Sequence, residues 1–393
     1  MSRLHDTLHP ALPEDAVSAV LAGRVWLPSV GGPAVVAVRD AALIDITAAY
    51  PTMRDLCEMK NPAAAIRAAT GPAIGTVRDV LDNTPPETRD GGKPWLLTPI
   101  DLQAVKAAGV TFAVSMLERV IEERARGNPA AAAAIRAEVQ RLIGDDLGKL
   151  KPGSTEAEEL KQVLMAQGAW SQYLEVGIGP DAEIFTKAPP MSAVGTGMDG
   201  GVHPKSSWNN PEPEIVLVVA SSGAIVGATL GNDINLRDVE GRSALLLGKA
   251  KDNTASAALG PFIRFLDAGY TLDTVRSTTV SLRVEGEDQF VVEGASSIAR
   301  ISRDPADLVA QMIGPHHQYP DGAVLYLGTM YAPVQDRGAP GSGFTHKTGD
   351  IVTVSAPGLG RLVNRMRPTN ECEPWAFGAG ALMRNLARRG LLG

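Results

Sequence analysis

Length, composition and charge already exclude several classes of protein. The chain has 393 residues, of which 44% are hydrophobic and 21% are charged, and its formal net charge is -7 at pH 7. This composition predicts a folded globular protein, and the length favours two domains over one. The negative charge offers no binding surface for nucleic acid or for an anionic membrane, so we expect neither partner.

Cysteine usage and the N-terminal residues bear on the compartment. Cys57 and Cys372 are far apart and outside any CxxC spacing, which argues against a disulfide scaffold and a thiolate metal site. The first sixteen residues have no basic region followed by an apolar one, and no apolar run approaches 18 residues. A signal peptide and a membrane span are therefore not expected, and we predict a cytoplasmic protein.

The first hundred residues predict strands followed by a helix. Apolar runs at 23–29 and 32–47, bounded by Gly, Pro and Asp, are typical of strands in a small sheet. Residues 52–69 predict a helix, and residues 85–100 a Pro-rich loop.

Three longer helices are expected next. Apolar residues at three- and four-residue spacing predict a helix over 99–127, with Asp101 as its N-cap. Residues 128–150 predict a second helix that begins at an Asn-Pro pair, and residues 155–174 a third, with Thr155 and Glu158 as a capping box.

From about residue 178 the pattern changes to strands. Residues 213–230 contain two β runs around Ser-Ser-Gly, which predicts a hairpin. Further strand runs follow at 279–294, 322–330 and 349–366. We therefore predict an α+β protein, with a smaller α/β domain over 1–170 and a β-rich catalytic domain over 171–393.

Three motifs carry little functional weight. GTGMDG at 195–200 matches a dinucleotide-binding pattern, but the segment after it cannot begin a helix, so a tight glycine turn is the better interpretation. GSG at 341–343 lacks the frame of a nucleophile elbow. His316 and His317 lack metal-ligand spacing, and a Pro-flanked loop favours solvated side chains.

Two carboxylates before an apolar run are more informative. In a strand, Glu212 and Glu214 point to the same face, about 7 Å apart along the chain at about 3.3 Å per residue. Like charges so placed raise each other's pKa unless a cation lies between them, and oxygen ligands favour Mg²⁺, Mn²⁺ or Ca²⁺. A solvated strand end is an equal alternative on spacing alone. Asp233, directly after the hairpin, offers a third oxygen ligand and favours the metal site.

These residues, taken in order, resemble the fumarylacetoacetate hydrolase superfamily over about residues 170–370. The resemblance rests on Glu212-Pro-Glu214 before its strand, NDINLRD at 232–238, GKAKDNTASAALGPFI at 248–263, LGTM at 327–330 and HKTGDIVTVSAPGLGRLVN at 346–364. FTKAPPMSAVGTG at 185–197 is similar to the family's entry segment. The resemblance implies a catalytic domain built as a mixed β roll. It also implies an assembly of at least two copies, either a homodimer or a homotetramer.

The resemblance also implies a set of site residues. Glu212, Glu214 and Asp233 would hold a divalent cation, usually Mg²⁺ with Mn²⁺ as the alternative, which chelates a 2-oxo acid. The substrate would be oriented by a lysine together with Arg237 and Thr329. Lys251 fits the family's spacing to Gly260, and Lys249 is its competitor.

One departure from the family narrows the activity. Hydrolases and decarboxylases of the superfamily carry a His and a Glu three residues later, which activate water. Here Gln172 stands at the His position and Glu175 keeps the acidic one. Because Gln cannot act as a base, the hydrolytic pair is incomplete.

The long N-terminal half and SSWNNPEPE at 206–214 resemble the sugar-acid branch, which contains 2-keto-3-deoxy-pentonate dehydratases, including the D-xylonate-derived one. The expected reaction removes water from a 2-keto-3-deoxy-pentonate to give 2-oxoglutarate semialdehyde. Glu175 is expected to take the C3 proton, with Lys251 beside the enolate. The alternatives are a hydrolase that cleaves the C–C bond of an acylpyruvate or a 2,4-diketo-3-deoxy sugar acid, and a binding module without turnover.

Overall fold

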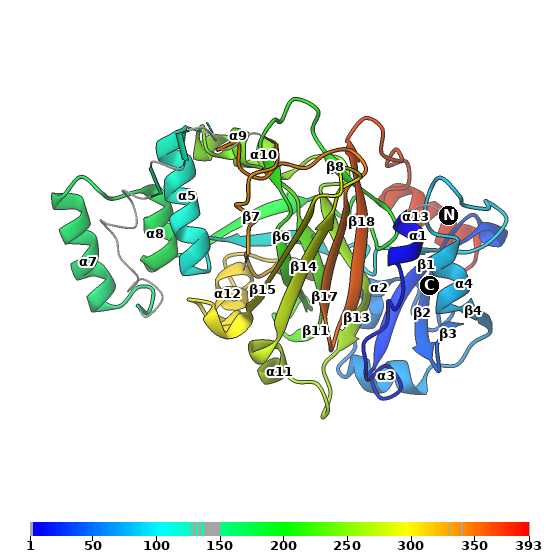
Figure 1. The fold of residues 1–393 in the computed structure, drawn as a ribbon. Coiled ribbons are helices and arrows are strands. Elements are labelled where there is room, and N and C mark those ends of the chain that lie inside the picture. Colours follow the sequence, from blue (N-terminus) through cyan, green and yellow to red (C-terminus); the bar gives the residue numbers. More distant parts are fainter. Residues whose placement is uncertain are drawn as a thin grey trace.

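Two stacked β-sheets form the centre of the computed structural model (Figure 1), which describes residues 3–126, 128, 131, 132, 135, 136, 150–329, 331–338 and 341–392. Within these residues the larger sheet has 11 strands. Its order is β4 (Ala73–Thr76), β3 (Ala42–Asp45), β2 (Gly32–Arg39), β1 (Leu21–Leu27), β13 (Ala257–Phe265), β11 (Ile225–Asp233), β10 (Pro213–Val219), β16 (Ala323–Tyr326), β6 (Ala104–Gly109) and β7 (Glu183–Ala188), with β5 (Trp95–Leu97) paired to β1.

The second sheet has five strands in the described residues, in the order β15 (Val291–Ser297), β14 (Thr279–Glu285), β17 (Ile351–Ala356), β18 (Gly360–Pro368) and β8 (Asp199–Val202). A short pair, β9 (Asn209–Asn210) and β12 (Asn235–Leu236), lies beside them. Most pairs are antiparallel, but β16 with β6 and β18 with β8 are parallel. The sheets are therefore mixed, and with the helices they confirm the predicted α+β class.

Helices cover the sheets and form one end of the molecule. They are α1 (Arg3–Thr7), α2 (Met53–Cys57), α3 (Pro62–Ala68), α4 (Val77–Asp82), α5 (Ala113–Ala125), α7 (Thr155–Ala166), α8 (Gln172–Ile178), α9 (Arg237–Glu240), α10 (Leu247–Lys251), α11 (Leu272–Ser277), α12 (Pro305–Met312) and α13 (Ala379–Arg388). Figure 1 shows α5, α7 and α8 together at the end opposite to β1–β4, with both termini at the β1–β4 end.

Strand β10 shows why the sheets stack. Ile215, Leu217 and Val219 lie in the apolar cluster shared with β14 and β17 of the second sheet. Val216 and Val218 point the other way, into a cluster shared with α2 and α3. Because successive side chains alternate between faces, a run that is apolar at every position is buried on both. The two Glu residues at its start are therefore carried into the interior.

The strand predictions of the second half are confirmed. The expected hairpin at 213–230 is β10 and β11, paired antiparallel from Pro213 with Asn232 onward. The run at 279–294 gives β14 and β15, and 349–366 gives β17 and β18. The first three strands of the N-terminal half are also found where the apolar runs place them.

The predicted helix over 99–127 is wrong in its first half. Residues Ala104–Gly109 form strand β6, and the helix α5 begins only at Ala113. Strand β6 pairs with β16 and β7, so sheet pairing overrides the helical spacing of its alanines. Asp101 is not the N-cap of this helix; its carboxylate accepts the backbone N–H groups of Met53 and Arg54, at 2.6 and 3.0 Å, at the start of α2.

Two other predicted helices are interrupted. The helix over 52–69 divides into α2 and α3 at Asn61, whose side chain caps α3 by accepting the N–H of Ala64 at 3.0 Å. The helix over 155–174 divides into α7 and α8 near Gly168, which has a φ of +65°.

The expected cap of the third helix is one residue off. Ser154, rather than Thr155, accepts the N–H of Ala157 at the start of α7, at 3.2 Å. The helix predicted over 128–150 lies largely outside the described residues.

The predicted division at residue 170 crosses the larger sheet. Strands β1–β6 come from the first part of the chain and β7, β10, β11, β13 and β16 from the second, yet they share one hydrogen-bonded sheet. The sheet is thus continuous across the proposed boundary. The assignment of two domains stays a prediction.

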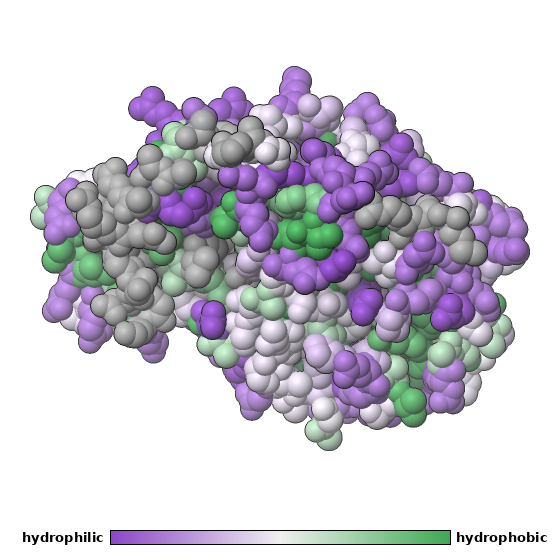
Figure 2. Space-filling model, viewed as in Figure 1, coloured by the Kyte–Doolittle hydropathy of each residue, from purple (hydrophilic) through white to green (hydrophobic). Residues whose placement is uncertain are grey.

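The visible surface agrees with a core that lies between the layers. Figure 2 shows hydrophilic residues over much of this face, with hydrophobic residues in separate patches. In the part of the chain that the structure describes, every helix is too short or too polar to cross a membrane.

Candidate metal centre and active site

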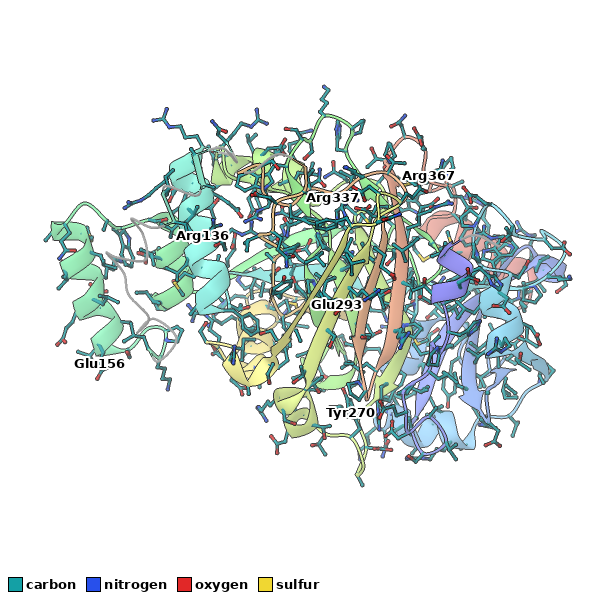
Figure 3. All side chains as sticks on the ribbon, in the orientation of Figure 1. Arg136, Glu156, Tyr270, Glu293, Arg337 and Arg367 are labelled. Carbon is teal, nitrogen blue, oxygen red and sulfur yellow. The ribbon has the colours of Figure 1, made fainter. Side chains whose placement is uncertain are left out.

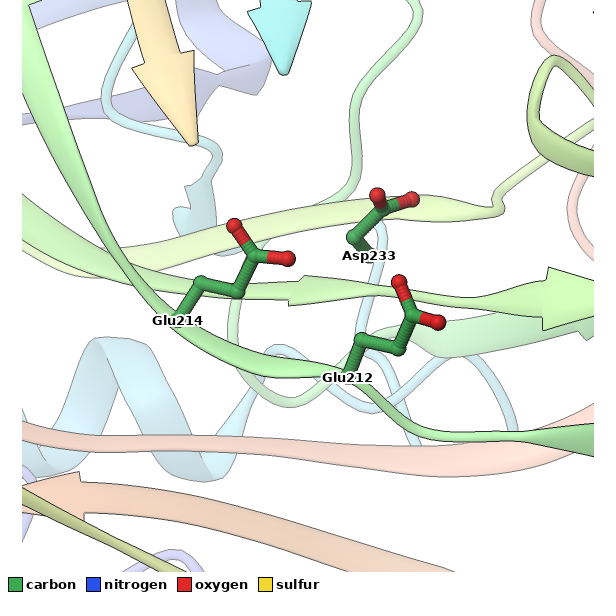
Figure 4. Close-up of side chains that lie close together, drawn as sticks. All are labelled: Glu212, Glu214 and Asp233. Carbon is green, nitrogen blue, oxygen red and sulfur yellow. The ribbon is translucent and has the colours of Figure 1, made fainter. Parts of the chain in front are cut away.

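Three buried carboxylates meet where β10 begins and β11 ends (Figure 4). Glu212 and Glu214 flank Pro213, which pairs with Asn232, and the N–H of Asp233 donates to the carbonyl of Glu212 at 2.9 Å. One carboxylate oxygen of each acidic residue lies within 4.8 Å of the others. The hairpin register thus brings together the three metal ligands that the sequence predicts.

The donor set fits a hard divalent cation. Glu212, Glu214 and Asp233 are each at most 2% exposed, and burying like charges side by side is unfavourable without a counter-charge. Burial, with Asp233 and Glu212 nearby, raises the pKa of Glu214 well above its usual range. Three oxygen donors at this spacing match the coordination preferences of Mg²⁺.

Two lysines bracket Asp233. Lys251 on α10 contacts Glu212 and lies 2.9 Å from Oδ2 of Asp233. Its competitor Lys249 is exposed, and the substrate-orienting role expected of Lys251 stays a prediction. Lys187 on β7 is fully buried and lies 2.9 Å from Oδ1 of Asp233. Its Nζ also donates to the carbonyls of Ile234 and Lys251, so Lys187 joins the end of β11 to α10.

Glu214 is held by the loop after β16. The N–H of Gly328 donates to its Oε2 at 2.7 Å, and the hydroxyl of Thr329 donates to its Oε1 at 3.3 Å. Gly328 has a φ of +98°, and a Cβ there would lie 3.0 Å from the carbonyl oxygen of Ala108. Thr329 therefore faces the carboxylate group, and the glycine before it is required by backbone geometry and space. The substrate-orienting role expected of Thr329 stays a prediction.

Arg237 lies in a different place from the one expected. Its guanidinium pairs with Glu122 at 2.6 Å and with Glu118 at 3.2 Å, both on α5, and stacks on the ring of Trp208 at 4.7 Å. Arg237 is not among the twelve described residues that line the carboxylate cavity, which are Ala108, Gly109, Val110, Arg119, Glu183, Phe185, Glu212, Glu214, Asp233, Glu240, Lys251 and Thr329. The structure thus places Arg237 as an anchor for α5.

Arg119 is the arginine that faces this cavity. From α5 it contacts Glu212 and lies 2.7 Å from Glu122 and 2.8 Å from Glu240. Burial alone would raise the pKa of Glu212, but Lys251 and Arg119 outweigh it and lower this pKa to about 2. Glu118 on the same helix also pairs with Arg136, at 2.7 Å, beside α5 in Figure 3.

Glu175 and Gln172 lie on α8, outside this group. Glu175 pairs with Lys161 of α7 at 2.6 Å, and its side chain is 43% exposed. Gln172 donates to Glu123 at 2.8 Å. Neither residue lines the carboxylate cavity, so the catalytic role expected of Glu175 stays a prediction that this arrangement does not favour.

Glu183 is an acidic residue of the cavity that the sequence interpretation missed. It begins β7 and lines the cavity across from Lys251 and the triad. Burial first and the nearby Glu240 second raise the pKa of Glu183, Arg119 opposes the shift, and the net result is a pKa of about 7. Within the described residues its carboxylate has no hydrogen-bond or ion-pair partner. A carboxyl group poised near neutral pH can accept a proton.

A sequence signal for Arg119 and Glu183 exists but is weak. Arg119 lies in a helix with Glu118 and Glu122, a spacing equally typical of a solvated helix face. Glu183 lies two residues before the FTK segment at 185–187, and only the pairing of β7 with β6 turns it toward the cavity.

The comparisons with known proteins agree with this geometry. Residues 180–367 match the family model described as fumarylacetoacetate (FAA) hydrolase, C-terminal. A 2-dehydro-3-deoxy-D-arabinonate dehydratase of Saccharolobus solfataricus is 31% identical over 188 residues, which cover 47% of this chain and 58% of that relative. A "Probable 2-keto-3-deoxyxylonate dehydratase" of Haloferax volcanii is 25% identical over 331 residues, covering 84% of this chain and 93% of the relative.

Solved structures share the fold. A 2-keto-3-deoxyarabinonate dehydratase matches with a TM-score of 0.62 at 20% identity, over 88% of this chain and 99% of the other. A 2-keto-3-deoxy-D-arabinonate dehydratase complexed with magnesium and 2,5-dioxopentanoate matches with a TM-score of 0.61 at 19% identity, over the same shares. At these identities the likeness shows the fold alone. Residues 180–367 thus match the model of the fumarylacetoacetate hydrolase C-terminal domain, and the chain shares its fold with these dehydratases.

Proposed function

We propose that this protein is a Mg²⁺-dependent dehydratase of 2-keto-3-deoxy-pentonates, derived from D-xylonate or L-arabinonate. The observation that carries the proposal is the buried triad of Glu212, Glu214 and Asp233 with Lys251 beside it, in a domain whose relatives are named as dehydratases of these acids. The structure of one neighbour holds magnesium and 2,5-dioxopentanoate, the product expected here.

The cation gives the site its first chemical function. Glu212, Glu214 and Asp233 would hold Mg²⁺, with Mn²⁺ as a substitute, and when bound the ion supplies Lewis-acid polarisation of the substrate's C2 carbonyl, which acidifies the protons on C3. The remaining steps belong to side chains of this chain.

Cationic groups orient the acid. Lys251 lies beside Glu212 and Asp233, where it stabilises negative charge that develops on the C2 oxygen. Arg119, which faces the same cavity, takes the substrate-binding role first expected of Arg237. Arg237 then contributes indirectly, because it holds Glu122 and therefore α5.

Glu183 is the proposed base. It removes one C3 proton, the C3–H electron pair becomes the C3–C4 double bond, and the C4 hydroxyl leaves with that proton as water. A proton then moves from C5 to C3, and the resulting enol of the aldehyde tautomerises to 2,5-dioxopentanoate, also called 2-oxoglutarate semialdehyde. Glu175 is the competing base, and its use requires α8 to move toward the cavity.

A coupled assay tests the proposed reaction. The purified protein is incubated with Mg²⁺ and each 2-keto-3-deoxy-pentonate stereoisomer, and a semialdehyde dehydrogenase reports the product as NADH. We expect NADH formation with at least one isomer, its loss in EDTA and its return on adding Mg²⁺.

Contrary results are equally clear. Pyruvate release from an acylpyruvate or a 2,4-diketo-3-deoxy sugar acid, without NADH from any pentonate, would establish the hydrolase instead. Tight binding of a 2-keto acid with no turnover would indicate a binding module. Assembly into two or four copies and a cytoplasmic location stay predictions from the sequence.

A further inference from the structure

The wall of the carboxylate cavity is formed where β6 ends and β7 begins. Gly109 and Glu183 are directly opposite each other in this antiparallel pair, and both line the cavity. Among the described residues β7 is the last strand of the larger sheet, so the strand paired with Glu183 there is β6. The position of its carboxylate is therefore decided by its neighbour on β6.

The side chain of Glu183 lies directly over Gly109. A Cβ atom at position 109 would lie 2.6 Å from Cδ of Glu183, 3.3 Å from its Cγ and closer still to Oε2. The φ of Gly109 is outside the left-handed region, so an L-residue could adopt this backbone. Space for the carboxylate, and not backbone conformation, is what requires glycine here.

The rest of β6 lacks such a constraint. Ala107 and Ala108, the preceding residues of β6, carry methyl groups opposite Phe185 and Ile184. A strand glycine elsewhere in the same sheet, Gly75 of β4, would place a Cβ 3.7 Å from Val80, which is ordinary contact. Gly109 therefore differs from Ala107, Ala108 and Gly75, because its lack of a side chain leaves space for the Glu183 carboxylate.

The close approach to Gly109 limits where this carboxylate can lie. In the described part of the chain Glu183 has no hydrogen-bond or ion-pair partner that would hold it over the cavity. We propose that Gly109 is a positioning residue, which gives the Glu183 carboxylate the space to face the cavity that holds the triad and Lys251. The inference rests on the proposed function, because it matters for turnover only if Glu183 is the base.

A single methyl group tests the proposal. In Gly109→Ala the fold is retained, since the flexible end of Glu183 can move, but the carboxylate is displaced from the cavity. We expect kcat to fall at least tenfold, with KM and Mg²⁺ affinity unchanged and the limb of the pH profile that belongs to Glu183 shifted. Gly75→Ala is the matched control and keeps wild-type kinetics. The double variant Gly109→Ala with Glu183→Gln is no slower than Glu183→Gln alone, because the two changes remove one function.

Each outcome separates this inference from the proposed function. If Glu183→Gln is inactive while Gly109→Ala keeps the wild-type kcat and pH profile, Gly109 does not position the base, and the inference fails alone. If Gly109→Ala lowers Tm and Mg²⁺ affinity together with kcat, its role is structural and the inference also fails. If Glu183→Gln keeps full activity, the assignment of the base fails, and the inference fails with it.

Discussion

Arg119 and Glu212 are 93 residues apart in the sequence, yet their side chains form an ion pair at the wall of the carboxylate cavity. The same guanidinium contacts Glu122 and Glu240, so a single residue of α5 neutralises carboxylates from three elements. This arrangement makes α5 part of the candidate active site rather than a peripheral helix.

Replacing Arg119 with methionine should therefore damage both stability and turnover. Removing one partner of a buried ion pair typically costs about 3–5 kcal/mol, since the remaining charges stay buried. We expect kcat/KM to fall at least a hundredfold and the free energy of unfolding to fall by about that amount. Arg119→Lys, which keeps the charge, should retain more of both. A wild-type KM in Arg119→Met would contradict a substrate-binding role.

Glu183 predicts the pH dependence of the rate. A base must be deprotonated, so kcat/KM should rise with pH through the pKa of Glu183, which burial raises to about 7. A cation in the same cavity favours the charged carboxylate and moves the midpoint downward. The rate profile should therefore show an acid limb with a midpoint at or below about 7.

The variants Glu183→Gln and Glu175→Gln distinguish the two candidate bases. We expect Glu183→Gln to lose activity and this limb, and Glu175→Gln to keep both, because Glu175 pairs with Lys161 outside the cavity. Loss of the limb in Glu175→Gln alone would restore the assignment made from the sequence.

Glu214→Gln should separate metal binding from folding. The pKa of Glu214 is raised by burial and by Asp233 and Glu212, so a neutral side chain of the same shape relieves repulsion in the metal-free protein. We expect an unchanged or higher Tm without Mg²⁺, and loss of the rise in Tm that the wild type shows when Mg²⁺ is added. Calorimetric titration with Mg²⁺ measures the affinity directly. Undiminished affinity would remove Glu214 from the ligand set.

We predict an effect on stability for Asp350, which is not among the residues that line the carboxylate cavity. It is fully buried and lies 2.7 Å from Arg337, which is labelled in Figure 3, and 3.2 Å from Nδ1 of His346. Asp350→Asn should lower the free energy of unfolding by about 3–5 kcal/mol, because Arg337 loses its buried charge partner and keeps only the more exposed Asp288. Asp288→Asn removes the more exposed partner of Arg337 and should cost about 1 kcal/mol or less.

The effect of Asp350 also has a pH dependence. Burial would raise the pKa of this carboxyl, but His346 and Arg337 outweigh burial and lower it. Its stabilising contribution is therefore complete above the unfolded pKa, about 3.9, and is lost as pH falls through the lower folded value. In chemical denaturation the gap between wild type and Asp350→Asn should close below that range. A gap that persists there would mean that the ion pair is not its source.

Much of the site was predictable because its residues are close in sequence and its three carboxylates belong to one hairpin. Strand periodicity places Glu212 and Glu214 on one face, and the hairpin that follows returns Asp233 to the same end. Lys251 lies 18 residues after Asp233 and was placed by its spacing to Gly260. In each of these cases the local period and a short turn determine the contact.

The residues that were missed depend on pairing between distant strands and on helix docking. Nothing local distinguishes Ala104–Gly109 as a strand, since its alanines also suit a helix, and the parallel pairing with β16 joins segments more than 200 residues apart. Without β6 in place, neither the direction of Glu183 nor the approach of α5 can be derived. Arg237 was assigned to the substrate because the family resemblance implies that role, whereas its carboxylate partners lie on α5.

The continuous larger sheet has a practical consequence for producing this protein in parts. A fragment that begins at residue 171 would lack β1, which pairs with β13, and β6, which joins β16 to β7. The edges of β13, β16 and β7 that lose their partners would then present unpaired backbone groups, which are templates for intermolecular association. We expect such a fragment to aggregate, so protein produced for crystallisation or engineering should contain both halves of the chain.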